Sequence, residues 1–276
     1  MRVLVIGTGN LAWHLVPNLE RIGLKVAVWT RDIDRFDYQS SKVGFRTGQD
    51  SDEAVFTREN LSGFAKTADG PLSFDAVFLA VPDDHIGSVS DRLSQLIAAD
   101  TPIVHTSGAT ATTKINDYFT IRAALWPIRS LRRGEVVAEW KDLPLVYFCD
   151  NANFEDQLAV WAGKMSELTY RLDNEQRAQL HLAAVFSNNF TTWLCQIAYE
   201  LCAEKNVPFE ALVPIIKNTF SRIDATEPAL RQTGAAQRGD EATMKRHLDL
   251  LDQQPAYADL YRRLSEMIME GMNNRK

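Results

Sequence analysis

The stretch that decides the fold is VLVIGTGNLAWHL, residues 3 to 15. Four apolar residues run directly into Gly7 and Gly9, and the amphipathic pattern of a helix begins at Leu11. A short apolar strand followed by a glycine turn and a helix is the opening of a βαβ unit. The sequence therefore predicts a parallel α/β domain that starts at the N-terminus.

The glycines of this stretch form the pattern GxGxxA at residues 7–12. In such a loop the first glycine permits the tight turn, the second lets a diphosphate approach the backbone, and Ala12 allows close helix packing. The free N–H groups and the dipole of the following helix favour an anion. We predict a dinucleotide site whose cofactor-binding residues are Gly7, Thr8, Gly9, Asn10 and Leu11. A purely structural turn is the alternative.

The residues after the second predicted strand bear on which nucleotide is bound. An acidic residue there would bind the ribose 2′-hydroxyl of NAD, but Thr30 and Arg31 occupy the place. A guanidinium can pair with a 2′-phosphate, which favours NADP, with NAD possible as cofactor. In the alternative interpretation Arg31 is solvated and Asp32 is the selector.

Short β-rich runs alternate with helical segments up to about residue 150, which predicts a mainly parallel sheet. The expected strands are Arg2–Ile6, Lys25–Trp29, Ala76–Val81, Pro102–His105, Ala123–Trp126 and Leu145–Phe148. The main helices expected between them are Leu11–Ile22 and Asp84–Ala99. The fold class is therefore α/β: residues 1–150 form a Rossmann-type doubly wound parallel sheet, and residues 151–276 form an all-helical domain for substrate binding or dimerisation.

The second half is expected to be helical apart from one short extended piece, Thr169–Leu172. Asp173 with Gln176 forms a capping-box pattern, and a helix can continue from there to about Lys205. A helix that is apolar around most of its girth must be buried on several sides, either within its own domain or against a second subunit. We expect a homodimer formed through the C-terminal helices.

Ligands in such sheets bind beyond the carboxyl ends of the strands. Val81 and Pro82 are therefore expected to line the cofactor cleft, and Ser107 to contact the nicotinamide or the substrate. His105 is a catalytic candidate, with packing at the strand end as the alternative. Trp126 is expected to form one wall of the pocket.

Polar residues recur along the long helix. At about 100° per residue, His181, Asn188 and Thr192 share one stripe, with Asn189 beside it. Buried amides need partners, which neighbouring loops or a ligand could supply. His181 and Asn188 are catalytic candidates, and Asn189 and Thr192 are candidates for substrate binding. Arg238 could bind a substrate carboxylate or pair structurally with Asp240.

Composition excludes several classes of protein. A net charge of −6 disfavours a nucleic-acid partner, and Arg129, Arg132 and Arg133 are too few to reverse it. The three cysteines show no metal-site spacing, so no metal is expected. No apolar run approaches the roughly 20 residues of a membrane span and no signal-peptide pattern is visible, so we expect a cytoplasmic protein that does not bind membranes.

These motifs together resemble the superfamily of pyrroline-5-carboxylate reductase and the 3-hydroxyacid dehydrogenases. More narrowly, VHTSG (104–108), LHLAAVFSNNF (180–190) and TGAAQRGD (233–240) resemble a family of bacterial Rossmann-like NADP oxidoreductases with a C-terminal helical domain of unknown function. Members are also described as deazaflavin-dependent NADP oxidoreductase-like. The resemblance implies the fold and a redox activity, and it leaves open the substrate and any deazaflavin co-substrate.

One departure from that superfamily concerns the mechanism. The 3-hydroxyacid dehydrogenases carry a catalytic lysine one turn before an asparagine, whereas Ala184 and Val185 stand at those positions here. His181, His105 or a water must then move any proton. We predict an NADP-dependent oxidoreductase that transfers a hydride between the nicotinamide and a small carbonyl or imine substrate. The alternative is a non-catalytic NADP-binding sensor or scaffold.

Overall fold

The computed structural model describes residues 1–29, 66, 70–135, 139–224 and 226–275. Thr30 and Arg31, the predicted cofactor selectors, lie outside the described residues. The chain forms two compact units, Met1–Val185 and Phe186–Lys276. The first unit therefore extends past residue 150, the predicted domain boundary, to include the helices and the strand that follow it.

The first unit is built on a seven-stranded sheet whose strand order is β2-β1-β3-β4-β5-β6-β7. The strands are β1 (Arg2–Ile6), β2 (Lys25–Trp29), β3 (Ala76–Leu79), β4 (Ile103–His105), β5 (Arg122–Pro127), β6 (Leu145–Cys149) and β7 (Thr169–Arg171). All neighbours pair in parallel except β5 and β6, which are antiparallel. The predicted fold class is confirmed, and β6 and β7, which run opposite to the other five strands, are the departure from a fully parallel sheet.

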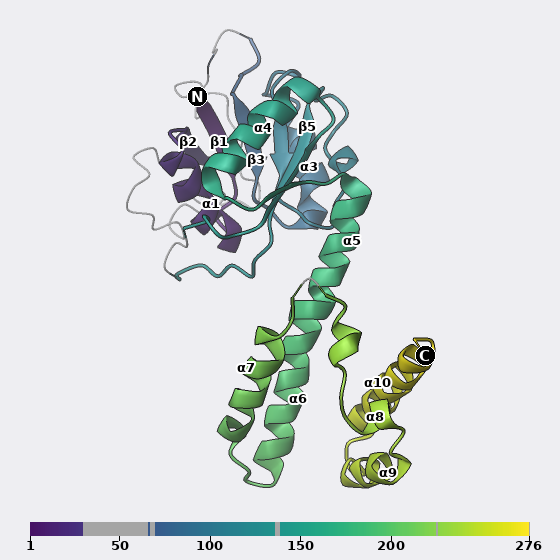
Figure 1. Cartoon of the computed structure of the whole chain (residues 1–276). Helices are drawn as coiled ribbons and strands as arrows, with labels where there is room; N and C mark the ends of the chain where they lie inside the picture. The colour runs from purple at the N-terminus through teal and green to yellow at the C-terminus, as the bar shows by residue number, and fades with distance from the viewer. Residues whose placement is uncertain (30–65, 67–69, 136–138, 225, 276) are drawn as a thin grey trace. The chain divides into compact units, whose positions relative to one another are not determined.

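Side chains alternate between two cores on the two faces of this sheet. On one face, Val3 and Val5 of β1 pack with α1 (Asn10–Arg21) and α4 (Ala152–Met165) (Figure 1). On the other face, Leu4 and Ile6 pack with α3 (Ile86–Leu93). Continuous apolar runs are what strands covered on both faces require, which explains why the sequence predicted the strands well.

The predicted helix Asp84–Ala99 is shorter than expected. A 3₁₀ turn, η1 (Asp83–His85), precedes α3, and α3 ends at Leu93. A second 3₁₀ turn, η2 (Thr112–Lys114), lies between β4 and β5. These turns place the residues after β3 and β4 at the carboxyl edge of the sheet.

The long helix predicted from Asp173 changes from α-helix to π-helix and back along its length. It consists of α5 (Asn174–Ala184), a π-helical turn η3 (Val185–Phe190), and α6 (Thr191–Glu204). The predicted capping box is present: the Asp173 carboxylate accepts from Gln176 N, and the Gln176 side chain accepts from Asp173 N. The expectation of uniform α-helix is therefore wrong at η3, where the hydrogen bonds shift to an i→i+5 pattern.

The second unit contains only helices among its described residues. After α6 come η4 (Phe209–Leu212), α7 (Val213–Ser221), η5 (Pro228–Arg231), α8 (Ala235–Arg238), α9 (Glu241–Leu250) and α10 (Pro255–Asn273). Few of its side chains are buried, and α6 buries only Ile197. The expectation that this helix is buried on several sides within its own chain is not met.

A search for membrane-spanning segments finds that none of the helices in the described part of the chain combines the length and the apolar character that a bilayer crossing needs.

Candidate functional site

The loop between β1 and α1 is shaped by a close contact with the end of β3. Gly7 has a φ of +108°, and a Cβ placed on it would lie 2.4 Å from the carbonyl oxygen of Ala80. The Gly7 N–H donates to Trp29 O at 2.8 Å, and the Ala80 N–H donates to Ile6 O at 2.9 Å. The predicted need for glycine at this turn is confirmed by both the backbone angle and the space.

The N-terminus of α1 has the features of an anion site. Its cap residue is Gly9, which has no side chain to cap the helix, and a Cβ there would meet no described atom within 4 Å. The first helical turn carries no acidic residue. Ala12 is fully buried against the sheet, so the helix packs closely. Open backbone N–H groups at a positive helix end fit the diphosphate of a dinucleotide.

Val81 and Pro82 follow β3, and Val81 lies beside this loop. A Cβ on Gly7 would come within 3.4 Å of Val81 Cγ1, and Pro82 is exposed at the start of η1. The structure therefore brings Val81 next to the glycine loop, and Pro82 is the next residue in the chain. Whether they contact a cofactor remains a prediction.

The hydroxyl of Ser107 is engaged within the protein. It donates to Asp83 Oδ2 at 2.6 Å and accepts from the backbone N–H groups of Ala109 and Thr110. Thr106, next to it, donates to Leu79 O at 3.0 Å. These bonds attach the loop after β4 to the segment at the end of β3. The observed role of the Ser107 hydroxyl is therefore to fix the conformation of this loop.

His105 is the last residue of β4 and has a fully buried side chain. Its Nδ1 accepts from Ser107 N at 3.2 Å, while Nε2 has no partner among the described residues. Burial, and then repulsion from Arg177, lower the pKa of His105 to about 3. His105 is therefore neutral near neutral pH, and its position fits the packing alternative better than direct contact with a substrate.

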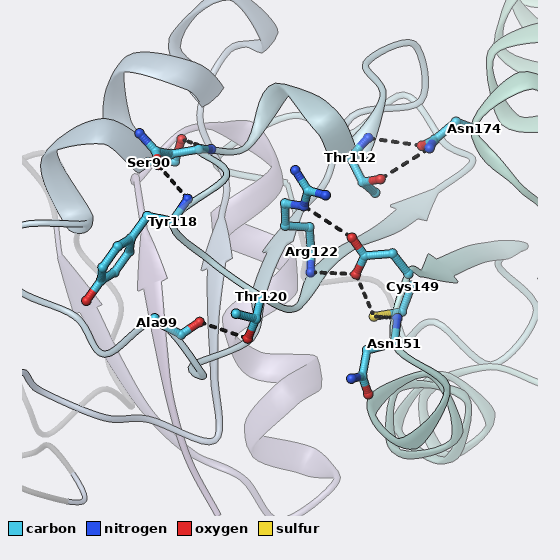
Figure 2. A network of polar contacts seen from close by, with 11 residues as sticks. Ser90, Ala99, Thr112, Tyr118, Thr120, Arg122, Cys149, Asn151 and Asn174 are labelled. Carbon is cyan, nitrogen blue, oxygen red and sulfur yellow. Dashed lines mark hydrogen bonds and ion pairs between the residues drawn. The ribbon is translucent and has the colours of Figure 1, made fainter.

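One face of α5 is docked on the loop that follows β4. The Asn174 side chain accepts from Thr112 N at 3.0 Å and donates to Thr112 Oγ1 at 3.2 Å (Figure 2). One turn later, Arg177 donates through Nη2 to Thr110 O and to Asn174 Oδ1. Residues three and four apart share a helix face, so the same face continues to His181.

Arg177 is a buried charge. Its side chain is fully buried, and Nε and Nη1 have no hydrogen-bond partner in the described part of the chain. Burial lowers the pKa of Arg177 to about 10, and Asp173 partly offsets this effect. The guanidinium stays charged at neutral pH and lies close enough to repel a proton from His105.

The docked face of α5 places His181 against the end of β5. The rings of His181 and Trp126 have centroids 5.4 Å apart in an edge-on arrangement. A Cβ on Gly108 would lie 2.7 Å from His181 Nδ1 and 2.5 Å from Trp126 Cε2, so only glycine allows this approach. His181 Nδ1 is buried without a hydrogen-bond partner in the described structure. The expectation that Trp126 walls this edge is consistent with this contact.

The other candidates lie in the second unit. Asn188 and Asn189 are on η3 and bond to each other through their amides at 3.3 Å, and Thr192 donates to Asn188 O at 2.8 Å. All three are exposed. The predicted stripe assumed 100° per residue, and the π turn between His181 and Thr192 changes that phase.

Arg238 is exposed at the end of α8. The Asp240 carboxylate caps α9 by accepting from Thr243 N at 3.0 Å, and this bond, together with the nearby Arg238 charge, lowers the pKa of Asp240. Asp240 therefore acts as the cap of α9, and the structural pairing of Arg238 with Asp240 stays a prediction. Binding of a substrate by Arg238 stays a prediction.

Two residues that shape the edge were not identified from the sequence. Asn174 and Arg177 occupy the first turn of a helix, where polar residues are ordinarily solvated, so their pattern carried no signal of burial. The glycine of VHTSG, Gly108, was noted only as part of a motif. A search of the described residues for clusters of histidine, cysteine, aspartate or glutamate that could hold a metal finds none.

Comparison with known proteins extends these observations. Residues 150–268 match a family model described as "Domain of unknown function (DUF2520)". Curated proteins give no match. The chain is similar to a "putative NADP oxidoreductase" from Bacteroides fragilis, with 26% identity, 98% of each chain covered and a TM-score of 0.76.

Two more distant structures share the fold. A Thermotoga maritima protein is 21% identical over 99% of each chain, with a TM-score of 0.68. An imine reductase from Myxococcus stipitatus, solved with NADP⁺, is 14% identical over 99% of this chain and 95% of its own, with a TM-score of 0.61. These matches confirm the resemblance drawn from the sequence at the level of fold and C-terminal domain.

Proposed function

We propose that this protein is an NADP-dependent oxidoreductase that transfers a hydride between the nicotinamide and a small carbonyl or imine compound. The observation that carries the proposal is the glycine loop, where Gly7 fits only without a side chain and the open end of α1 can receive a diphosphate. The full-length similarity to an NADP oxidoreductase-like protein and to an imine reductase supports the same class.

The cofactor would be held by residues 7–11 and flanked by Val81 and Pro82. We propose NADP as the preferred nucleotide, with NAD as a weaker alternative, because Thr30 and Arg31 stand where an NAD-binding chain would place a carboxylate. The bound cofactor supplies the hydride, and the chain must bind, orient and exclude water around it.

Within the first unit, His181 is the group we propose to hold or move a proton. It is fixed by α5 against Trp126, and its Nδ1 is unused by the described residues. A protonated imine needs no proton from the enzyme during hydride transfer, whereas a ketone does. An imine therefore suits a site that lacks the lysine of the 3-hydroxyacid dehydrogenases. Imines are therefore the substrate class we favour within the proposal.

The remaining candidates are proposed on side-chain chemistry alone. Asn188 can orient a reacting group through its amide, Asn189 and Thr192 can hydrogen-bond a substrate, and Arg238 can bind a carboxylate. Each proposal is tested by alanine substitution, with KM as the expected parameter to change for Asn189, Thr192 and Arg238.

The experiment that tests the function follows the loss of reduced-nicotinamide absorbance with panels of 2-oxoacids, aldehydes and cyclic imines. We expect turnover with NADPH, strongest on a cyclic imine, and a loss of about a hundredfold in kcat for His181→Ala on the carbonyl substrates, which need the proton that a protonated imine already carries. The matched control is Gln179→Ala, an exposed position on the same helix.

The same experiment separates the rival functions. Tight NADPH binding without turnover on any panel would favour the sensor or scaffold. Absence of binding by both NADPH and NADH would overturn the proposed site itself.

We also propose that the protein is a homodimer formed through its C-terminal helices. The second unit exposes many large apolar side chains. Large exposed apolar patches are rare on monomeric proteins and often mark a protein–protein interface. Among the most exposed are Phe186, Phe190, Trp193, Tyr199, Ile215, Ile223, Leu230 and Met267.

A further inference from the structure

The segment that follows β5 is attached to the first turns of α1. The Arg133 N–H donates to Asn10 Oδ1 at 3.1 Å, and the Trp13 indole N–H donates to Glu135 O at 3.0 Å. His14, which is buried, bonds through Nε2 to Arg132 O at 2.9 Å. Three side chains of α1 therefore hold residues 132–135 in place beside the glycine loop.

This segment carries the tight basic cluster that was too small to indicate a nucleic-acid partner. It contains Arg129, Arg132 and Arg133, with Glu135 as its single carboxylate. The Arg133 guanidinium lies 5.8 Å from the centre of the Trp13 ring, in a cation–π arrangement. None of the three arginines forms an ion pair with a residue that the structure describes.

The position of Arg133 is set by the first residue of α1. Asn10 directly follows Gly9, and its backbone belongs to the helix end whose N–H groups favour an anion. The hydrogen bond from the Arg133 backbone N–H to Asn10 therefore fixes the backbone of a cationic residue next to that helix end, and its guanidinium lies over the Trp13 ring of the same helix. A guanidinium offers a planar fork of donors that suits a phosphate better than a point charge does.

We propose that Arg133 binds the diphosphate of the dinucleotide, so that the segment after β5 and the helix end of α1 hold this group together. The inference rests on the proposed function, since it takes the dinucleotide site as its starting point. It separates two roles: Arg133 contributes affinity for the diphosphate that NADP and NAD share, and the residues after β2 contribute the choice between them.

The test measures the Kd of NADPH and of NADH by calorimetry for the wild type, Arg133→Gln and Arg129→Gln. Loss of a charge-assisted contact raises the Kd of both nucleotides by about tenfold or more in Arg133→Gln. The ratio of the two Kd values stays within about twofold of the wild type, because both nucleotides carry the diphosphate. Arg129→Gln removes the same charge from an exposed position of the same segment and leaves both Kd values within about twofold.

A second variant guards against misfolding. Arg133→Lys keeps the charge without the planar fork, so it should recover part of the affinity that Arg133→Gln loses. Thermal unfolding of each variant, compared with the wild type, shows that the fold is intact.

Each other outcome overturns the inference. If Arg133→Gln binds both nucleotides like the wild type, Arg133 does not contact the cofactor. If only NADPH binding weakens, Arg133 binds the 2′-phosphate instead, and if Arg129→Gln weakens binding equally, the effect is general charge. Wild-type protein that binds neither nucleotide overturns the proposed function and this inference with it, whereas the first outcome overturns the inference alone.

Discussion

At the scale of single residues, Gly7 shows how one missing side chain positions a site. Its φ of +108° is a conformation that side chains rarely adopt, and the space for a Cβ is already occupied by Ala80 O. The loop can therefore turn directly from β1 into α1 and leave the helix end open.

Gly7→Ala is expected to lower the free energy of unfolding by roughly 1–3 kcal/mol, because of backbone strain and the clash with Ala80 O. The loop must shift to relieve the clash, so NADPH affinity should fall as well. Denaturant unfolding and calorimetry measure the two effects.

The control is Gly163→Ala, at an exposed position in the last turn of α4, where a Cβ would meet no described atom within 4 Å. Alanine is the better helix former, so this variant should be about 0.5–1 kcal/mol more stable than the wild type. A Gly7→Ala protein as stable as the wild type would contradict the proposed role of this turn.

His105 makes stability depend on pH. Its pKa is lowered from 6.5 to about 3 in the folded protein by burial and by Arg177. Below about pH 6.5 the unfolded chain therefore binds a proton on this histidine that the folded protein does not bind. The contribution of neutral His105 is therefore complete above this pH, and it is lost as the pH falls toward 3.

We expect His105→Asn to show a shallower fall in stability than the wild type between about pH 6.5 and pH 4.5, where a single such group contributes up to ~1.4 kcal/mol per pH unit. Denaturant unfolding across this pH range measures the slopes. Gln179→Ala, at an exposed position without a titrating group, serves as the control and should keep the wild-type slope. Equal slopes for His105→Asn and the wild type would show that His105 titrates normally.

At the scale of elements, α5 is the helix that completes the edge of the sheet. Asn174 and Arg177 attach its first turns to the loop after β4, and the same face brings His181 to Trp126. The capping box at Asp173 starts the helix in the correct register, so the sequence predicted its beginning correctly.

Asn174→Ala is expected to destabilise the protein by about 1–3 kcal/mol, because the buried Thr112 loses the partner of its backbone N–H. It should also lower the rate of any NADPH-dependent turnover, since His181 is held by the same face. Gln179→Ala, at an exposed position of α5, should change stability by less than about 0.5 kcal/mol.

Unfolding and steady-state kinetics on the same preparations test both parts. An Asn174→Ala protein with full stability would show that α5 is held by other contacts. If Asn174→Ala keeps full stability but turns over more slowly, Asn174 affects turnover without being needed to attach α5.

At the scale of the whole molecule, the two units differ in how well they bury their apolar residues. The first unit encloses two cores around its sheet, whereas the second exposes Trp193 by 59% and Ile215 by 62%. Such exposure in a helical unit is what a partner surface requires.

If the C-terminal helices form a homodimer, a charge placed on them should weaken it. Trp193→Glu and Ile215→Glu are each expected to raise the dimer Kd by about tenfold or more, since a buried carboxylate at an interface is costly. Sedimentation equilibrium measures the shift. Val160→Glu, at an exposed apolar position on α4 in the first unit, is the control that should leave the assembly unchanged.

A wild-type protein that stays monomeric at all accessible concentrations would overturn the proposed dimer. The exposed apolar residues of the second unit would then be the binding surface for a partner other than a second copy of this chain.

The sequence by itself determined the elements and the loop that could receive a nucleotide. Apolar runs, glycine positions and the capping box are local signals, because strand burial, turn geometry and helix initiation each depend on residues close together in the chain. For this reason six of the seven strands, the extended piece at β7 and the glycine turn were predicted from residue patterns alone.

Only the tertiary structure decided which side chains meet. The burial of His105 and Arg177, the contact of Gly108 with His181 and Trp126, and the attachment of Arg133 to Asn10 all join segments far apart in sequence. An arginine at the start of a helix and an arginine in a loop have the same local pattern as solvated residues. Their environments depend on packing between distant strands and helices, which no spacing along the chain records.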